Sequence, residues 1–77
     1  MEQLTEDQLA QVPDEFELTS PNDTNFTMEY WWSSPGGEVI LQYSDEWYLQ
    51  AKDFEGQKYV TLDAAYQTAI DIMRGEV

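Results

Sequence analysis

Carboxylates are the side chains best suited to do chemistry in this chain, because the residues that most often act as nucleophiles and neutral-pH bases are missing. The sequence has 16 Asp and Glu residues but no histidine and no cysteine. A serine or cysteine nucleophile activated by histidine is therefore excluded, as is a zinc site built from thiolates and imidazoles. What remains is acid–base work by paired carboxylates, or binding of a hard cation through oxygen ligands.

Glu29 and Glu38 are the nearest candidates for a catalytic pair, because the predicted strands put them on one face of a sheet. Such chemistry needs a cleft that desolvates one carboxyl, and 77 residues leave little room for one. Acidic turns at residues 45–46 and 53–55 offer oxygen ligands for Ca²⁺ or Mg²⁺, but neither has EF-hand spacing. We therefore predict a protein that is not an enzyme and uses no metal or cofactor.

The charge distribution says more about the kind of partner. The net charge is -13, and the three bases, Lys52, Lys58 and Arg74, all lie after residue 51. Such a surface repels nucleic acid and anionic membrane and is steered toward basic surfaces. The alternative is that the acidity serves only solubility. The sequence lacks a basic start and an apolar run of about 20 residues, which predicts a soluble cytoplasmic protein.

The stretch from Phe26 to Ala51, which holds all three tryptophans, organises the rest of the chain. Turn signals at residues 34–37 and 44–46 divide it into three strands. If Ser33 pairs with Glu38, each residue on the face predicted to be buried lies opposite another apolar residue. A one-residue slip would instead pair polar with apolar residues. The buried face that these registers predict is Met28, Tyr30, Trp32, Val39, Leu41, Tyr43, Trp47, Leu49 and Ala51.

Helix signals stand at both ends of the chain. Thr5, with Gln8 three residues later, predicts a capping box that opens a short helix over 6–12, and Pro13 ends it. A second helix is predicted after the cap residue Thr61. Its apolar residues fall on one stripe, and a glycine at position 75 ends it. The stripe consists of Leu62, Ala65, Tyr66, Ala69, Ile70 and Met73.

The connecting segments carry weaker signals. Residues 14–19 fit an edge strand or an extended linker, which would place Glu15 and Glu17 on one side. Residues 20–25 have the composition of a loop. Residues 53–57 read as a turn in which Gly56 supplies a positive φ. The predicted fold is therefore α+β, in a single domain spanning 1–77. A three-stranded antiparallel β-meander packs against a C-terminal helix, with a short N-terminal helix.

The face of the meander opposite the covering helix is predicted to be wet. On it, Trp31, Ile40 and Tyr48 form an apolar island edged by Glu29 and Glu38. Exposed apolar patches with polar rims often mark interaction sites, and Trp and Tyr dominate binding hot spots. The alternative is that the apolar residues of the N-terminal segment fold over this island.

Two kinds of function fit these features. The first is a nucleic-acid mimic that binds and inhibits a basic, nucleic-acid-binding protein. In size, charge and aromatic content the chain resembles the small acidic proteins that phages use against host defences. Anti-CRISPR proteins, anti-restriction proteins and uracil-glycosylase inhibitors are examples, although no residue motif assigns the chain to one of these families. The predicted partner-binding residues are Glu15, Glu17, Glu29, Trp31, Glu38, Ile40, Asp45, Glu46 and Tyr48.

The second kind of function is a small accessory or regulatory protein, or a homodimer, that uses the exposed aromatic face. The acidity would then serve only solubility. Binding that weakens steeply with salt and is competed by DNA or RNA would indicate mimicry. Binding that depends on Trp31 and is insensitive to salt would indicate the accessory role.

Overall fold

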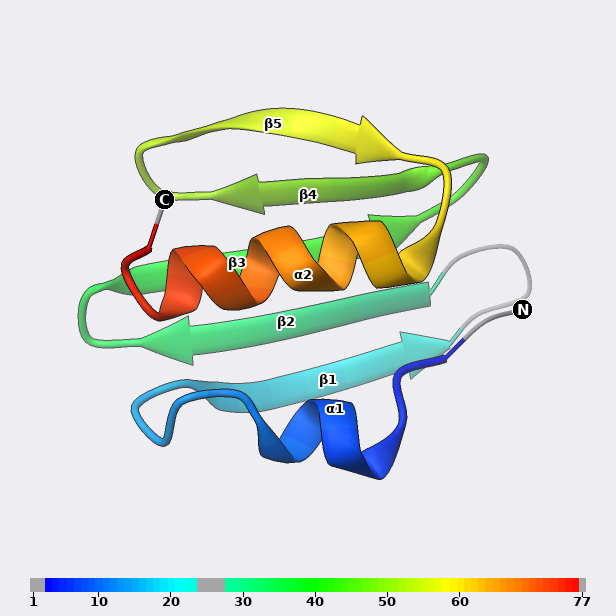
Figure 1. Cartoon of the computed structure of the whole chain (residues 1–77). Helices are drawn as coiled ribbons and strands as arrows, with labels where there is room; N and C mark the ends of the chain where they lie inside the picture. The colour runs from blue at the N-terminus through cyan, green and yellow to red at the C-terminus, as the bar shows by residue number, and fades with distance from the viewer. Residues whose placement is uncertain (1–2, 24–27, 77) are drawn as a thin grey trace.

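The computed structural model describes residues 3–23 and 28–76 of the chain. These residues form a five-stranded antiparallel sheet in the order β1-β2-β3-β4-β5, together with two helices. The elements along the chain are α1 (Glu6–Ala10), β1 (Glu17–Asp23), β2 (Met28–Ser34), β3 (Gly37–Tyr43), β4 (Trp47–Ala51), β5 (Phe54–Tyr59) and α2 (Leu62–Met73) (Figure 1). The α+β class is confirmed, but the prediction of three strands is wrong, because a further strand lies on each side of the meander.

The central three strands have the predicted registers. Ser33 pairs with Glu38 across the β2–β3 turn, and the ladder runs one pair further, to Ser34 and Gly37. Across the β3–β4 turn, Tyr43 pairs with Trp47. The continuous apolar face of the three strands fixes these registers, because a slip would turn its core side chains toward water.

Strand β1 corrects the prediction of a loop over residues 20–25. Residues 20–23 are paired with β2, with Pro21 opposite Tyr30, whereas residues 24–25 lie outside the described part of the chain. Proline lacks the N–H that a central strand would need, but an edge strand is hydrogen-bonded on one side only and tolerates it. The polar residues and the single proline of this segment are therefore compatible with an edge strand.

Strand β5 corrects the prediction of a turn over residues 53–57. The connection from β4 is only Lys52-Asp53, and Asp53 takes the positive φ, of 59°. Aspartate is one of the few residues that tolerates this region of backbone conformation. Gly56 lies within β5 instead, so its small size, and not its backbone freedom, is what this position uses.

A single core fills the space between the sheet and α2. Leu41, Leu49 and Ala65 are completely buried, and the rings of Tyr30 and Trp32 stack with centroids 5.6 Å apart. The predicted buried face is confirmed, since all nine of its members are buried or packed against the core. The six-residue stripe of α2 is buried as predicted as well.

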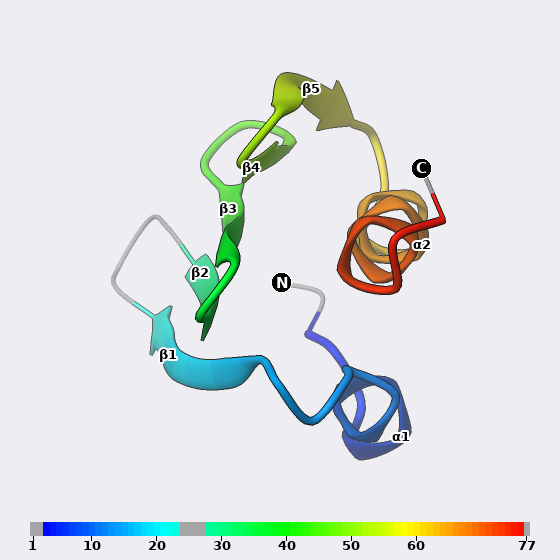
Figure 2. The ribbon, with the colours of Figure 1, turned by 90° about the vertical axis from the view of Figure 1, so that its left-hand side faces the viewer.

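The N-terminal segment packs on the same side of the sheet as α2 (Figure 2). The buried Leu4 donates its backbone N–H to the Tyr30 hydroxyl at 3.0 Å. The Tyr66 hydroxyl donates to the carbonyl of Gln8 at 2.6 Å, which ties α2 to α1. The alternative that this segment folds over the opposite face is therefore wrong.

The predicted start of α1 and the predicted end of α2 are confirmed, but the predicted end of α1 is wrong. The capping box of Thr5 and Gln8 is present, although α1 ends at Ala10 and not at residue 12. At the end of α2, Gly75 adopts a φ of 75° and donates to the Ile72 carbonyl, the hydrogen-bonded ending that glycine favours. Among the residues described, neither helix has the length and apolar character needed to cross a membrane.

Candidate interaction face

We call the side of the sheet opposite the helices the outer face. Among the described residues, no helix covers it (Figure 2). Residues that pair directly in an antiparallel sheet point to the same side, so the registers assign its members. The outer face comprises Glu17, Glu29, Trp31, Ser33, Glu38, Ile40, Gln42, Tyr48, Gln50 and Lys58. Six of the nine predicted partner-binding residues are therefore on one surface.

A hydrogen bond joins the aromatic and acidic parts of the outer face. The indole N–H of Trp31, on β2, donates to a carboxylate oxygen of Glu38, on β3. Ile40 lies directly opposite Trp31 on β3, so the indole has an apolar cross-strand neighbour as well as the carboxylate. A hydrogen bond to an ionised acceptor is stronger than one between neutral groups, and it fixes the orientation of the indole.

The second carboxylate of the predicted pair has a partner of its own. Gln42 Nε2 donates to Glu29 Oε2 at 3.0 Å, and the two residues lie directly opposite each other. Glu29 and Glu38 are therefore each bound by a different neighbouring side chain. A carboxylate has about four lone-pair sites, so it can accept further bonds from a partner's basic groups.

A hollow of about 390 Å³ lies at the β3–β4 turn. Tyr48 forms one wall on the outer face, and the turn supplies Asp45 and Glu46. An aromatic wall with two carboxylates suits a guanidinium or ammonium group. Lys58 also lines the hollow, opposite Tyr48 on β5, together with Gln42. Neither Lys58 nor Gln42 was a predicted site residue. Lys58 could not be placed here from the sequence, because only the pairing of β4 with β5 brings it beside Tyr48.

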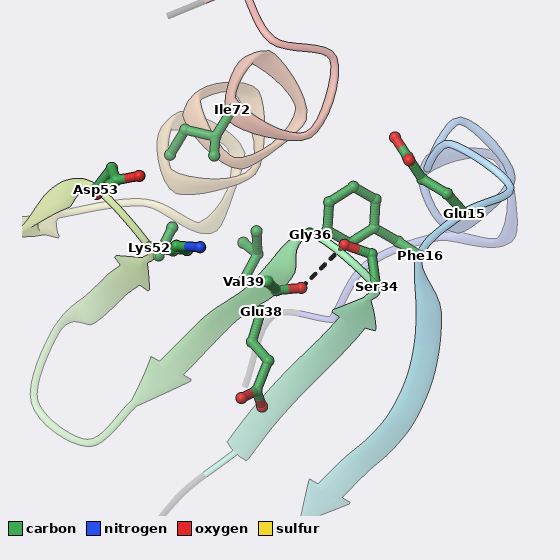
Figure 3. Close-up of a pocket in the computed structure, with 11 residues that line it drawn as sticks. Glu15, Phe16, Ser34, Gly36, Glu38, Val39, Lys52, Asp53 and Ile72 are labelled. Atoms are coloured by element: carbon green, nitrogen blue, oxygen red, sulfur yellow. Dashed lines mark hydrogen bonds between the residues drawn. The ribbon is translucent and has the colours of Figure 1, made fainter.

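Glu15 is the predicted site residue that lies elsewhere. It precedes β1, so it does not share a strand with Glu17, and that part of the prediction is wrong. It lines a cavity of about 260 Å³ between the end of α2 and the sheet, with Phe16 and Ile72 across from each other (Figure 3). The Glu38 carboxylate points away from this cavity (Figure 3). Glu15 is therefore not part of the outer face.

Metal binding receives no structural support in the part of the chain that is described. In residues 3–23 and 28–76, no group of three or more carboxylates gathers in a way that would hold a metal ion. The acidic turns at residues 45–46 and 53–55 are exposed apart from Phe54. What these carboxylates offer is a set of hydrogen-bond acceptors with a strong negative field.

Comparison with protein-family models, with curated proteins and with solved structures gave no match for this chain.

Proposed function

We propose that this protein is a small acidic interaction protein that binds and inhibits a basic, nucleic-acid-binding partner through the outer face. One observation carries the proposal. Both helices pack on the opposite side, so the acidic and aromatic side chains of the outer face stay accessible. A partner that normally holds phosphates would meet Glu29 and Glu38 with its Arg and Lys side chains.

The charge of the whole chain supports the same partner. A net charge of -13 on 77 residues accelerates encounter with a basic surface and repels nucleic acid. Affinity and specificity would come chiefly from Trp31 and Tyr48, because exposed ion pairs add more to the association rate than to affinity. The hydrogen bond from Trp31 to Glu38 supports this role, since an anchored ring loses less entropy on binding.

The proposal is tested by measuring binding to a panel of purified basic DNA- and RNA-binding proteins. For a true partner, the logarithm of the affinity should fall linearly with the logarithm of salt concentration between about 50 and 200 mM. Duplex DNA or RNA should compete, and the bound partner should lose its nucleic-acid binding. Binding that neither salt nor nucleic acid weakens would contradict mimicry.

Two double variants of equal net charge distinguish the effect of the outer-face carboxylates from that of the net charge of the protein. Glu29→Gln with Glu38→Gln removes two charges on the outer face. Asp14→Asn with Glu76→Gln removes two exposed charges outside it, so both variants change the net charge from -13 to -11. We expect the first pair to weaken binding about tenfold and the second pair to change it far less. Equal losses would show that only the net charge matters.

The accessory role remains a second candidate, because the apolar side chains of the same face are also accessible. Trp31, Ile40 and Tyr48 are only partly buried. Under this alternative, Trp31→Ala abolishes partner binding while the double Glu→Gln variant binds normally. Binding would then be insensitive to salt, since apolar contacts are not screened.

A further inference from the structure

The outer edge of β5 is a strand edge with the chemistry to pair with a second copy of this chain. In the sheet of described residues, β5 pairs with β4 on one side and with no strand on the other. An edge strand leaves a row of backbone N–H and C=O groups without ladder partners, which is a template for another strand. From these features we propose that two copies associate through antiparallel pairing of their β5 strands.

The charges of β5 are self-complementary in one register. Glu55 and Lys58 are its two charged residues, and both are exposed. The bulge in β5 between Phe54 and Gln57 allows an antiparallel register centred on Gln57. In it, Glu55 and Gly56 together face Lys58 of the second copy, and two-fold symmetry forms the Glu55–Lys58 pair twice. The half-buried Phe54 then lies opposite Tyr59 of the second copy, which makes an aromatic pair at each end. A lysine on an edge normally opposes pairing, but this register gives it a carboxylate partner.

The opposite edge of the sheet is unsuited to the same pairing. Strand β1 contains Pro21, which lacks a backbone N–H, and it begins and ends with acidic residues, Glu17 and Asp23. Two β1 strands contain no base between them, so their pairing would add like charges with no attractive partner. The neutral β5 edge is therefore the one that a chain of net charge -13 can present to its own copy.

An exposed apolar side chain lies at the end of this edge. Val60, directly after β5, is 85% exposed and is the only large apolar side chain among the described residues classed as exposed. Apolar surface left in water at a strand end is the kind of surface that association removes.

A two-fold axis normal to the sheet would keep both outer faces on the same side, so the dimer would present two copies of the interaction face side by side.

Sedimentation equilibrium tests the proposal, with protein from about 1 μM to about 1 mM near physiological ionic strength. The wild-type chain should associate to a dimer in this range. Lys58→Glu, with a net charge of -13 - 2 = -15, should lose at least about tenfold in association constant because two attractive pairs become repulsive.

Glu55→Lys is the decisive variant, because its net charge of -13 + 2 = -11 should favour association if only long-range repulsion matters. The proposed register predicts the reverse. The association constant should fall about tenfold, since the introduced lysine would face Lys58 of the second copy. The swap Glu55→Lys with Lys58→Glu restores both the net charge and the pairs, so it should dimerise like the wild type. A monomeric wild type, or a Glu55→Lys variant that associates more tightly, would overturn the proposal. Trp31→Ala should leave the dimer unchanged, which separates this test from that of the outer face.

Discussion

The ring of Tyr48 on β4 lies directly against Gly56 on β5. A Cβ added at position 56 would lie 2.7 Å from the ring carbon that bears the hydroxyl, closer than real Cβ contacts allow. Gly56 has no unusual φ, so the position needs glycine for space alone. An aromatic side chain lying over a glycine in the neighbouring strand covers backbone that would otherwise be poorly packed. This contact sets the place of Tyr48 on the outer face.

Gly56→Ala should therefore destabilise the fold by displacing Tyr48. We expect a loss of about 1–3 kcal/mol in the free energy of unfolding, the usual cost of overpacking. In a Tyr48→Ala background the space is empty, and the same substitution should be neutral or stabilising by about 0.5 kcal/mol, since alanine restricts the unfolded chain. Urea denaturation of the wild type, the two single variants and the double variant measures the free energies of this double-mutant cycle. An equal cost of Gly56→Ala in both backgrounds would contradict the contact.

The difference between Gly56 and the residues of the central strands shows what the sequence could reveal. The pairings of Ser33 with Glu38 and of Tyr43 with Trp47 could be predicted, because every second residue of a strand points to the buried face. Apolar residues at every second position therefore reveal the register. No such pattern in the sequence reveals the role of Gly56. A glycine that makes room for a neighbouring strand looks in sequence the same as a glycine that turns the chain. Strand β5 was missed for this reason.

The placement of the N-terminal segment was beyond the sequence for a different reason. Its position is fixed by the bonds from Leu4 to Tyr30 and from Tyr66 to Gln8, which join residues 26 and 58 positions apart. Neither bond has a periodic signature, and the apolar residues of a short helix could dock on either face. The places of Glu29, Trp31, Glu38, Ile40 and Tyr48 on the outer face were predictable, because they follow from the registers of the central strands. Glu17 reaches this face through the pairing of β1 with β2, where the sequence left an edge strand or a linker open.

The side chain of Gln8 performs two tasks that a single substitution can separate. Its Oε1 accepts from the Thr5 backbone N–H at 2.9 Å, while its Nε2 donates to Asp63 at 3.1 Å. Gln8→Glu keeps an acceptor for the capping box but sets a second carboxylate against Asp63. We expect a loss of about 0.5–1.5 kcal/mol, measured by urea denaturation. Adding Asp63→Asn should restore stability, because the new amide can donate to the introduced carboxylate. No recovery would show that the loss does not arise from the contact with Asp63.

The phenol of Tyr66 should make the fold sensitive to alkaline pH. Burial raises the pKa of Tyr66 above its ordinary value of 10.0, an effect that Arg74 opposes and Asp63 reinforces. Above about pH 10 the unfolded chain releases a proton that the folded chain retains, so stability falls as pH rises. The contribution is fully present below that pH and is lost as pH passes through the folded-state pKa.

Tyr66→Phe tests this dependence. It removes the bond to the Gln8 carbonyl, at a cost of about 1 kcal/mol at neutral pH, and it removes the titrating group. The stability of the variant should therefore fall less steeply than that of the wild type above about pH 10. Urea denaturation at a series of pH values gives both curves. Parallel curves above about pH 10 would show that Tyr66 does not carry the effect.

Truncation of the two neighbouring tryptophans of β2 should destabilise the fold to very different extents. Trp32 is 1% exposed in the core and stacks on Tyr30, so Trp32→Ala should cost about 3–5 kcal/mol, much of the stability of so small a domain. Trp31 is partly exposed on the outer face, and its loss should cost only about 1 kcal/mol, chiefly through the bond to Glu38.

The contrast between the two variants links the fold to the proposed function. Trp31→Ala should remain folded, as judged by its urea transition, yet lose partner binding by about 2 kcal/mol or more, the scale of a hot-spot residue. Trp31→Phe keeps a ring but lacks the N–H that donates to Glu38, so its affinity should fall between those of the wild type and Trp31→Ala. If Trp31→Ala binds as tightly as the wild type, the aromatic part of the outer face is not the anchor, and the carboxylates alone would have to hold the partner.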